Sequence, residues 1–521
     1  MEKKHIVGID LGTTYSAIAH FDEHGRPEIV PNVDNERITP SVIYFGEDEI
    51  IVGRVAKNES VADPENVVQF VKRYMGDPDR FFPIRGTDYT PETLSAIILL
   101  KLVGDADKVL NFEPGTITDA VITVPAYFND AERKATQDAG KIAGLNVIAT
   151  LNEPTAAALA YGMDQQGEAK TVLVYDLGGG TFDVTIIKIQ GKNIEVLATD
   201  GERKLGGKDF DDELINFVSE NFIDEFGIDP RDDLDSLQDL QIKCEEAKIT
   251  LSRKDSVRIL VQCQGNSMKV EVTRKQFEEL IRPLIEQTET YLGLVLNEAD
   301  ITWEEIDEVL CVGGSTRIPM VQEMLTKVTG KSPNIDINPD EVVALGAVYY
   351  AGLLTVKEAQ DSGQEIPADV ISPEVVGLLE GMVVENVNSH PLGIVSIVEG
   401  ERRNVIMIPA QTKLPARMEK LFQTAYDNQV SVEVQVVEGA SADVDECTMI
   451  GTVRISDLPP NRMKGNLVRV IYEYDMNGRV NIYARDEDTG KDASAEILRS
   501  SGLSDDEVMD QFDSLQELVI D

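Results

Sequence analysis

Two glycine-rich stretches, GIDLGTTYS at residues 8–16 and VYDLGGGTFDV at residues 174–184, decide the fold of this chain. Each stretch follows an apolar run, places an Asp (Asp10 or Asp176) at the end of that run, and continues through glycines into a second apolar run. Glycine allows a tight turn and lets backbone N–H groups come close to a phosphate. We therefore interpret each stretch as a phosphate-binding hairpin whose Asp holds a metal ion, such as Mg²⁺, through water.

The pair of hairpins indicates a duplicated domain with one nucleotide between its copies. A single turn of this kind is a weak signal, because such turns are common in ordinary hairpins. Here each copy begins its own half of an α/β region, and a third glycine turn, GGSTR, follows at residues 313–317. This repetition predicts two related lobes that face one another.

Length and composition predict a soluble protein of several domains. The 521 residues exceed a single core, and 42% are hydrophobic and 27% charged. The net charge of −45 argues against nucleic acid or a membrane as partner. The four cysteines include no C-x-x-C pair, so neither a zinc site nor a disulfide framework is indicated. The N-terminus lacks the apolar core of a signal peptide, and we expect a cytoplasmic location.

Several charged residues stand where either chemistry or ordinary structure could explain them. Residues 65–74 are predicted to form a helix that carries Lys72, for which solvent exposure is the plain alternative. Glu153 precedes a helix that starts with proline, where a carboxylate can serve as a simple cap. On a helix predicted for residues 237–251, Glu245 and Lys248 share one side with Ser252 and could reach one ligand. A solvent-exposed Glu–Lys pair explains them equally well.

The pattern changes after residue 356. Residues 357–381 are polar, with prolines and acids, and predict a linker or spacer. Residues 382–499 alternate with period two, and an Asn477-Gly478 turn joins two of the runs, so we predict a β-sandwich.

The chain closes with one further predicted helix. It lies within residues 500–521, and Ser504 and Glu507 form its capping box. Its apolar stripe consists of Val508, Phe512, Leu515 and Val519.

Seven ordered motifs resemble those of the heat-shock 70 kDa chaperone family (DnaK-like). They are GIDLGTTYS, VPAYFND, NEPTAAALAYG, DLGGGTFDV, LGG-x-DFD, VGGSTRIPMV and NPDE, and the resemblance runs from residue 5 to about residue 510. It implies an actin-like ATPase of two lobes, with a duplicated ribonuclease-H-like fold, over residues 1–356. It further implies a peptide-binding β-sandwich over residues 382–499 and a truncated lid helix over residues 500–521.

The resemblance also assigns roles to residues of the ATPase. Lys72 matches the catalytic lysine that neutralises charge and orients the attacking water. Around it, the carboxylates of Asp10, Glu153, Asp176 and Asp183 match those near hydrated Mg²⁺, K⁺ and the attacking water. The implied phosphate cradle is Gly12, Thr13, Thr14, Tyr15, Gly178, Gly179, Gly180 and Thr181, with Thr181 also in the catalytic group. The implied nucleoside pocket is Gly207, Glu245, Lys248, Ser252, Gly313, Gly314, Ser315, Arg317 and Asp340.

Two further groups follow from the resemblance. Pro125 and Arg133 match a proline switch that relays the nucleotide state to the peptide domain. The implied peptide cleft is Ile394, Ile397, Phe422, Ala425, Val432 and Val434, although alternating Val and Ile are equally what any sandwich core requires.

The chain departs from the family pattern in ways that bear on function. Ile249 stands where the family usually has an arginine that stacks on adenine, so we expect weaker nucleotide binding. Only Val383 and Val384 remain of the usual leucine-rich linker, which puts coupling between the domains in question. A single lid helix predicts either fast peptide exchange or a use of the β-domain other than peptide binding.

We therefore expect an ATP-hydrolysing chaperone that binds ATP or ADP with Mg²⁺ and K⁺. Its expected partners are extended hydrophobic peptides, a J-domain cochaperone and a nucleotide-exchange factor, with no nucleic acid and no membrane. Two alternatives stay open from the sequence: a nucleotide-sensing scaffold with one dedicated partner, and a small-molecule kinase on the same ATPase fold.

Overall fold

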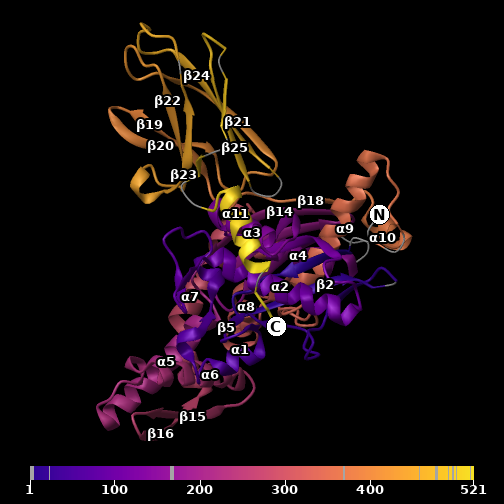
Figure 1. Cartoon of the computed structure of the whole chain (residues 1–521), viewed down its shortest axis with the longest axis vertical. Helices are drawn as coiled ribbons and strands as arrows, with labels where there is room; N and C mark the ends of the chain where they lie inside the picture. The colour runs from indigo at the N-terminus through magenta and orange to yellow at the C-terminus, as the bar shows by residue number, and fades with distance from the viewer. Residues whose placement is uncertain are drawn as a thin grey trace.

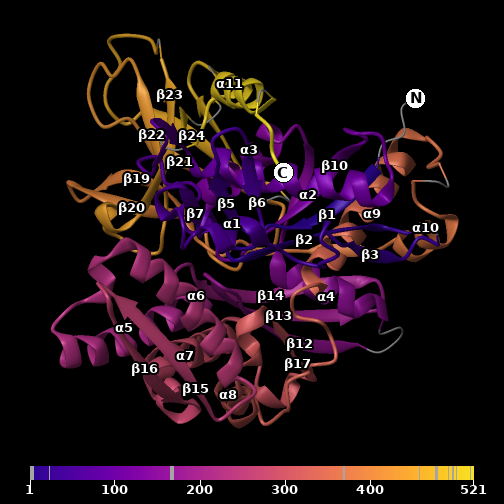
Figure 2. The same cartoon turned by 60° about the horizontal axis from the view of Figure 1, so that its bottom comes forward.

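A computed structural model describes residues 5–22, 24–164, 169–367, 370–456, 458–475, 479–490, 492–495, 498–499, 502–516 and 518–521. Two α/β lobes lie against one another, and an all-β domain packs at one end of them (Figures 1 and 2). This arrangement confirms the expected fold class.

The central sheets of the two lobes share one strand pattern, as expected for a duplication. In each sheet three antiparallel strands follow one another, and the first of them also pairs with a parallel strand on its other side. The lobe I strands are β1 (His5–Asp10), β2 (Tyr15–Phe21), β3 (Pro27–Val30), β4 (Thr39–Pro40), β10 (Ile117–Val124) and β11 (Asn146–Asn152). The lobe II strands are β12 (Lys170–Leu177), β13 (Phe182–Gln190), β14 (Asn193–Glu202) and β17 (Glu308–Val312).

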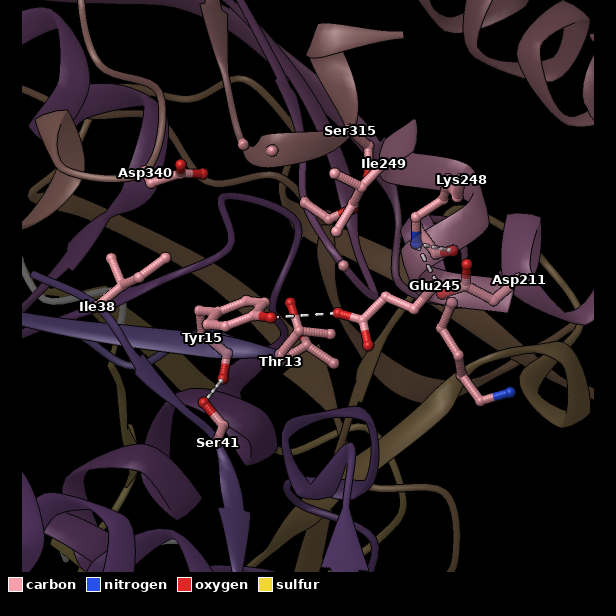
Figure 3. Close-up of a pocket in the computed structure, with 18 of the residues that line it drawn as sticks. Thr13, Tyr15, Ile38, Ser41, Asp211, Glu245, Lys248, Ile249, Ser315 and Asp340 are labelled. Carbon is pink, nitrogen blue, oxygen red and sulfur yellow. Dashed lines mark hydrogen bonds and ion pairs between the residues drawn. The ribbon is translucent and has the colours of Figure 1, made fainter. Parts of the chain in front are cut away.

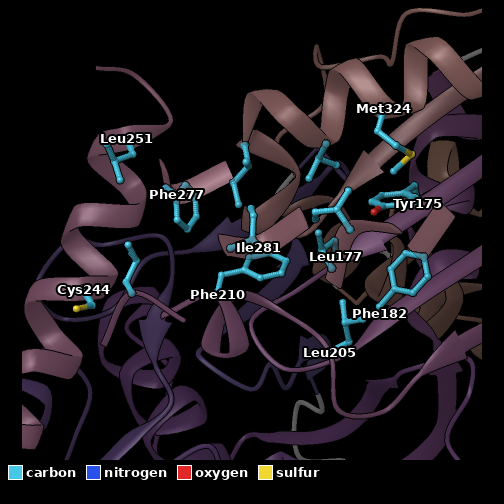
Figure 4. Close-up of a cluster of buried hydrophobic side chains, with 14 of the residues drawn as sticks. Tyr175, Leu177, Phe182, Leu205, Phe210, Cys244, Leu251, Phe277, Ile281 and Met324 are labelled. Atoms are coloured by element: carbon cyan, nitrogen blue, oxygen red, sulfur yellow. The ribbon is translucent and has the colours of Figure 1, made fainter. Parts of the chain in front are cut away.

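Helices bury the apolar faces of both sheets. In lobe I, α2 (Pro91–Leu110) and α3 (Asp130–Ile142) supply one core with strands β1 and β10. In lobe II, a large core of aromatic and aliphatic side chains lies between the sheet and its helices (Figure 4). The lobe II helices are α5 (Gly207–Phe226), α6 (Leu234–Leu251), α7 (Arg274–Glu298) and α8 (Pro319–Thr329), and α5 to α7 pack on the hairpin of β15 (Ser256–Cys263) and β16 (Asn266–Thr273).

Two helices, α4 (Glu153–Asp164) and α9 (Val342–Ser362), pack between the lobes. They cross so closely that a Cβ at Gly346 would lie 1.8 Å from the Ala156 carbonyl oxygen, so glycine is required there. Among the described residues, α9 is also the one helix with the length and hydropathy of a membrane span, but 61% of that apolar window is buried inside the protein. We therefore assign α9 to the core.

Residues 65–74 lie in a small subdomain of lobe I, and the prediction that they form a helix is wrong. These residues form a 3₁₀ turn, strand β7 (Val67–Gln69) and a second 3₁₀ turn (Val71–Tyr74). Val67 and Val68 pair with strand β5 instead of facing a helix core, because β-branched side chains fit a pleated sheet well. The other elements of this subdomain are β5 (Val42–Phe45), β6 (Ile50–Val52), β8 (Phe82–Ile84), β9 (Thr87–Tyr89) and α1 (Arg54–Glu59).

Residues 357–381 were expected to be a spacer, but their described part packs on the lobes. Helix α9 continues to Ser362, and helix α10 (Pro373–Leu379) follows. Val375 and Leu379 of α10 are buried in the core between the lobes, which fixes α10 in place.

The following segment joins the sheet of lobe II. Strand β18 (Val383–Glu385) pairs in parallel with Asn193–Glu195 of β14. Val384 is buried, whereas Val383 is 48% exposed. The apolar remnant of the linker therefore extends the lobe II sheet by one edge strand.

The β-domain is a sandwich of two antiparallel sheets with a core of alternating apolar side chains. One sheet contains β19 (Leu392–Val398), β20 (Glu401–Ile408), β22 (Val432–Glu438), β23 (Thr448–Ile455) and β27 (Leu498–Arg499). The other contains β21 (Ala416–Gln423), β24 (Leu467–Tyr474), β25 (Val480–Asp486) and β26 (Asp492–Ala495). The predicted Asn477-Gly478 turn lies outside the described residues.

The last helix, α11 (Asp505–Gln516), packs on lobe I beside α3 (Figure 1). The Ser504–Glu507 capping box forms as expected, and Val508 and Leu515 are buried in the lobe I core. Beyond α11, residues 519–521 run beside β6, where the Ile50 N–H donates to the Val519 carbonyl at 2.9 Å.

Candidate functional site

The two glycine-rich hairpins face each other, and each fits against the other only because of glycine. A Cβ at Gly179 would lie 2.4 Å from Thr14 Oγ1, and a Cβ at Gly180 would lie 2.5 Å from Thr13 Cγ2. Such distances leave no room for any larger residue without a shift of the backbone. The hairpins of the two lobes therefore form the two walls of one site.

Between these walls lies a cavity of about 560 Å³ lined by both lobes. Figure 3 shows Thr13 and Tyr15 of the first hairpin opposite Glu245 and Lys248 of α6. Nearly all residues expected to hold the nucleotide line this cavity. The exceptions are Gly180, which packs behind Thr13, and Asp183, which lies deeper.

A buried ion pair joins the catalytic candidates at the bottom of the cavity. Lys72 Nζ lies 2.5 Å from Glu153 Oε1, and both side chains are nearly inaccessible to solvent. The neighbouring carboxylates of Asp10 and Asp183 accept hydrogen bonds from Thr123 Oγ1 at 3.1 Å and the Tyr127 N–H at 3.0 Å, respectively. Neither the solvated lysine nor the simple helix cap describes this arrangement.

The buried carboxylates outnumber the single lysine, and the pKa values of three of them are raised. Burial, followed by the charge of Glu153, raises the pKa of Asp10 to about 7 and that of Asp183 to about 7. The same causes raise the pKa of Asp176. Burial alone would lower the pKa of Lys72, but the charges of Glu153 and Asp10 reverse this and raise it. The site thus has an excess of negative charge that a bound cation would neutralise.

Oxygen donors and excess negative charge fit a hard cation such as Mg²⁺. Within the part of the chain that is described, no three His, Cys, Asp or Glu side chains lie close enough together to ligate an ion directly. An ion that keeps several of its waters and meets the carboxylates through them fits this geometry, as does Mg²⁺ bound mainly by phosphate oxygens.

The opposite end of the cavity is formed by helix α6. Glu245 accepts hydrogen bonds from Lys57 Nζ at 2.5 Å and from the Tyr15 hydroxyl at 3.3 Å, so it joins lobe II to lobe I across the cavity. Lys248 Nζ donates to Asp211 Oδ2 at 2.6 Å and to the Gly207 carbonyl at 2.8 Å. The Glu–Lys pair is therefore not a simple surface pair.

The third glycine turn completes this end. Ser315 Oγ donates to the Gly178 carbonyl at 2.9 Å, which ties the third turn to the second hairpin. Arg317 Nη1 lies 2.7 Å from Asp340 Oδ2 at the mouth of the cavity. Ile249 lies nearby and is half exposed. An arginine held flat by a carboxylate at the rim can stack on an aromatic base.

Three site residues have partners that the sequence did not reveal. Arg73, next to Lys72, donates to the Gly180 carbonyl at 3.1 Å and pairs with Asp209. Lys57 bridges the lobes, and Asp211 holds Lys248. Their partners lie far along the chain, and no local pattern marks them.

The residues expected to relay the nucleotide state and to form the peptide cleft do not line the cavity. Pro125 follows β10, and Arg133 of α3 is buried and donates to the Ala126 and Phe128 carbonyls and to Asn152. Of the expected cleft residues, Ile394 and Val434 are buried in the sandwich core, Phe422 and Val432 are partly buried, and Ile397 and Ala425 are exposed. The peptide cleft thus stays a prediction.

The chain is similar to known proteins over nearly its whole length. The family model described as "Hsp70 protein" matches residues 6–518. The chain is 41% identical over 515 residues to the proteins named "Chaperone protein DnaK" from Thermotoga petrophila, Thermotoga maritima and Thermotoga neapolitana. In each case the match covers 97% of this chain and 82% of the relative.

Proposed function

This chain belongs to the Hsp70 protein family, and from that premise we propose how its own residues carry out the family's work. As a member it is an ATP-dependent molecular chaperone and an ATPase that uses ATP and ADP with Mg²⁺. This membership favours the chaperone over a dedicated scaffold or a small-molecule kinase.

We propose that the nucleotide phosphates bind between the two hairpins. The observation that carries this assignment is the opposition of Gly179 to Thr14 and of Gly180 to Thr13 across one cavity. Backbone N–H groups of the hairpins would donate to the phosphate oxygens, which supplies positive potential in a chain with a net charge of −45.

In the proposed reaction Lys72 neutralises charge on the phosphates and orients the attacking water. Phosphoryl transfer depends mainly on such positioning and electrostatic stabilisation. Glu153 holds the ammonium group of Lys72 in place through their ion pair. Asp10, Asp176 and Asp183 would hold Mg²⁺ through water, and this ion neutralises phosphate oxygens when bound. We also propose that a K⁺ ion binds near these carboxylates.

The nucleoside would lie between α6 and the third glycine turn. Glu245, Lys248 and Ser252 offer polar groups to the ribose side, and Arg317 offers a flat guanidinium to the base. Ile249 provides only an aliphatic contact, so we expect a lower affinity than an arginine there would give.

The β-domain is proposed to bind extended hydrophobic segments of unfolded proteins. Exposed Ile397 and Ala425 lie at the expected cleft. A J-domain cochaperone and a nucleotide-exchange factor are the proposed protein partners, and we propose a cytoplasmic location from the free cysteines.

ATP turnover by the full chain, measured with and without an unfolded apolar peptide, tests this function. We expect slow basal hydrolysis that rises several-fold with the peptide, since binding in one domain biases chemistry in the other. A peptide of the same length with Asp in place of its apolar residues serves as the control. Absence of hydrolysis, or equal stimulation by both peptides, would contradict the proposal.

A further inference from the structure

The main chain of Tyr127 contacts the catalytic site on one side and the β-domain on the other. Its N–H donates to Asp183 Oδ1 at 3.0 Å, and Asp183 belongs to the buried carboxylates around Lys72. Its carbonyl oxygen lies 2.9 Å from Nε2 of His390, which stands two residues before β19, the first strand of the sandwich. Two hydrogen bonds and one residue therefore separate the catalytic carboxylates from the β-domain.

The segment around Tyr127 is held as one unit. Arg133 donates to the carbonyl oxygens of Ala126 at 3.1 Å and Phe128 at 3.0 Å, one on each side of Tyr127. Arg133 also donates to Asn152 Oδ1 at 2.9 Å. These buried bonds hold the peptide groups on both sides of Tyr127, and so fix its N–H and its carbonyl relative to one another.

His390 is well suited to detect such a displacement. The Tyr127 carbonyl can only accept, so Nε2 of His390 must be the nitrogen that donates. The imidazole also lies edge-on to the Tyr127 ring, with centroids 4.2 Å apart and planes at 64°. The ring contact places His390, while the hydrogen bond requires one position of the Tyr127 carbonyl.

Burial favours the neutral form of His390. Glu132, Arg133 and Arg203 face it from lobes I and II. Burial, and then the charge of Arg203, lower the pKa of His390, against the hydrogen bond to Tyr127 and the charge of Glu132. A neutral imidazole has a single N–H, and here this group donates its hydrogen bond to the Tyr127 carbonyl oxygen.

We propose that His390 is a positioning residue that couples the β-domain to ATP hydrolysis by reading the position of the Tyr127 carbonyl, and through it that of Asp183. This inference rests on the proposed function, since it assumes that a bound nucleotide shifts Asp183. When Asp183 moves, the Tyr127 carbonyl leaves or meets Nε2 of His390, and the contact between β-domain and lobe I weakens or strengthens with it. Conversely, peptide binding that moves His390 repositions Asp183 beside the phosphates.

Two substitutions separate the hydrogen bond from the packing. His390→Phe keeps an aromatic ring against Tyr127 but removes the donor. His390→Gln loses the ring but presents an amide N–H near the position of Nε2. For each variant of the full chain, ATP turnover is measured with and without the unfolded apolar peptide, and peptide release is timed with ATP and with ADP.

We expect His390→Phe to keep basal turnover and to lose peptide stimulation by about fivefold, as for the loss of one buried hydrogen bond. Its peptide release rates with ATP and ADP should also converge. His390→Gln should retain most of the stimulation, a rescue that packing alone does not explain.

Full stimulation in His390→Phe, or an equal loss in both variants, would overturn the coupling role. A wild-type chain that hydrolyses ATP without any response to peptide would overturn it as well. A wild-type chain that hydrolyses no ATP would instead reject the proposed function, so the two failures are distinguishable.

Discussion

Lys72 illustrates how the surroundings of one residue decide its role. A lysine in a polar stretch ordinarily points into solvent, but here its ammonium group lies 2.5 Å from Glu153 and the Lys72 side chain is 6% exposed. A buried charge of this kind is retained only with partners, and the carboxylates of Asp10 and Asp176 add to them. Its position in a cavity lined by the two glycine-rich hairpins supports the proposed catalytic role.

Substitution Lys72→Ala tests that role at the residue scale. We expect ATP turnover to fall by about 100-fold or more, as when a charge-stabilising group is removed from an active site. Nucleotide affinity should change little, because hairpin N–H groups and the α6 pocket remain. Turnover and nucleotide titration measure the two effects separately.

Lys269→Ala is the matched control, since Lys269 is exposed on β16, away from the cavity. It should leave both quantities unchanged. Hydrolysis at the wild-type rate in Lys72→Ala would exclude Lys72 from the mechanism.

At the scale of elements, α10 and β18 together attach the linker to lobe II. Lys192 Nζ donates to the carbonyls of Gly377 at 3.0 Å and Glu380 at 2.7 Å, which satisfies the C-terminal end of α10. Three residues after Glu380, β18 begins to pair with β14, and the Val383 N–H donates to the Lys192 carbonyl at 2.9 Å. A leucine-poor linker is thus docked by its backbone and by the helix before it.

Substitution Val384→Asp tests the docking of β18. Burial of an unpaired carboxylate is costly, so we expect β18 to leave the sheet edge. Peptide stimulation of ATP turnover should then fall by about tenfold, equal to ~1.4 kcal/mol of lost coupling. Basal turnover should stay near that of the wild type, because Val384 does not line the cavity.

The neighbouring substitution Val383→Asp provides the control, because that side chain is half exposed and its strand hydrogen bond comes from the backbone. It should preserve stimulation. Equal losses in the two variants would show that charge near β18, rather than burial, is responsible.

At the scale of the whole molecule, the β-domain is docked on both lobes at once. Gln411 exchanges hydrogen bonds with the backbone of Thr199 in lobe II, at 3.1 and 2.8 Å. On lobe I, Glu438 accepts from the N–H of Asp130 at the start of α3. A carboxylate at a helix N-terminus is favourable, but this one is buried beside the carboxylate of Asp130.

This interface predicts a pH dependence of domain docking. Burial, followed by the charge of Asp130, raises the pKa of Glu438 to about 8, against Arg133 and Arg203. Docking is therefore accompanied by uptake of a proton at Glu438. The contribution of Glu438 to docking is complete below its ordinary pKa of 4.5 and is lost as the pH rises to about 8. His390 has the opposite effect on docking. Burial lowers its pKa, so at a pH below the ordinary value of 6.5 docking releases the proton of His390, and docking becomes more favourable as the pH rises toward 6.5.

Below about pH 6.5 the proton taken up by Glu438 and the proton released by His390 nearly cancel. Between about pH 6.5 and about pH 8 only Glu438 responds, so docking should weaken. Hydrogen exchange of the Asp130 N–H, divided by its intrinsic rate at each pH, measures docking because this N–H donates to Glu438. Glu438→Gln should remove most of the upper dependence. An unchanged dependence in this variant would assign the effect to other groups.

The sequence by itself determined the features that depend on neighbouring residues. The two hairpins, the third glycine turn and the Ser504–Glu507 cap follow from local backbone needs, so their motifs predicted them. The alternation of the β-domain predicted its strands for the same reason. The helix expected over residues 65–74 is wrong because valines that match a helical spacing also suit a strand, and only the presence of β5 as a partner selects the strand.

Tertiary structure alone decided which distant residues meet. Lys57 reaches Glu245, Arg73 reaches the Gly180 carbonyl, and His390 reaches Tyr127 across 107 to 263 positions of the chain. Such contacts depend on how lobes and β-domain pack, and the chain between the partners leaves no periodic trace of them. The two glycine-rich hairpins could therefore be predicted from the sequence, whereas the bonds that link their surroundings to the β-domain depend on the docked arrangement of the whole molecule.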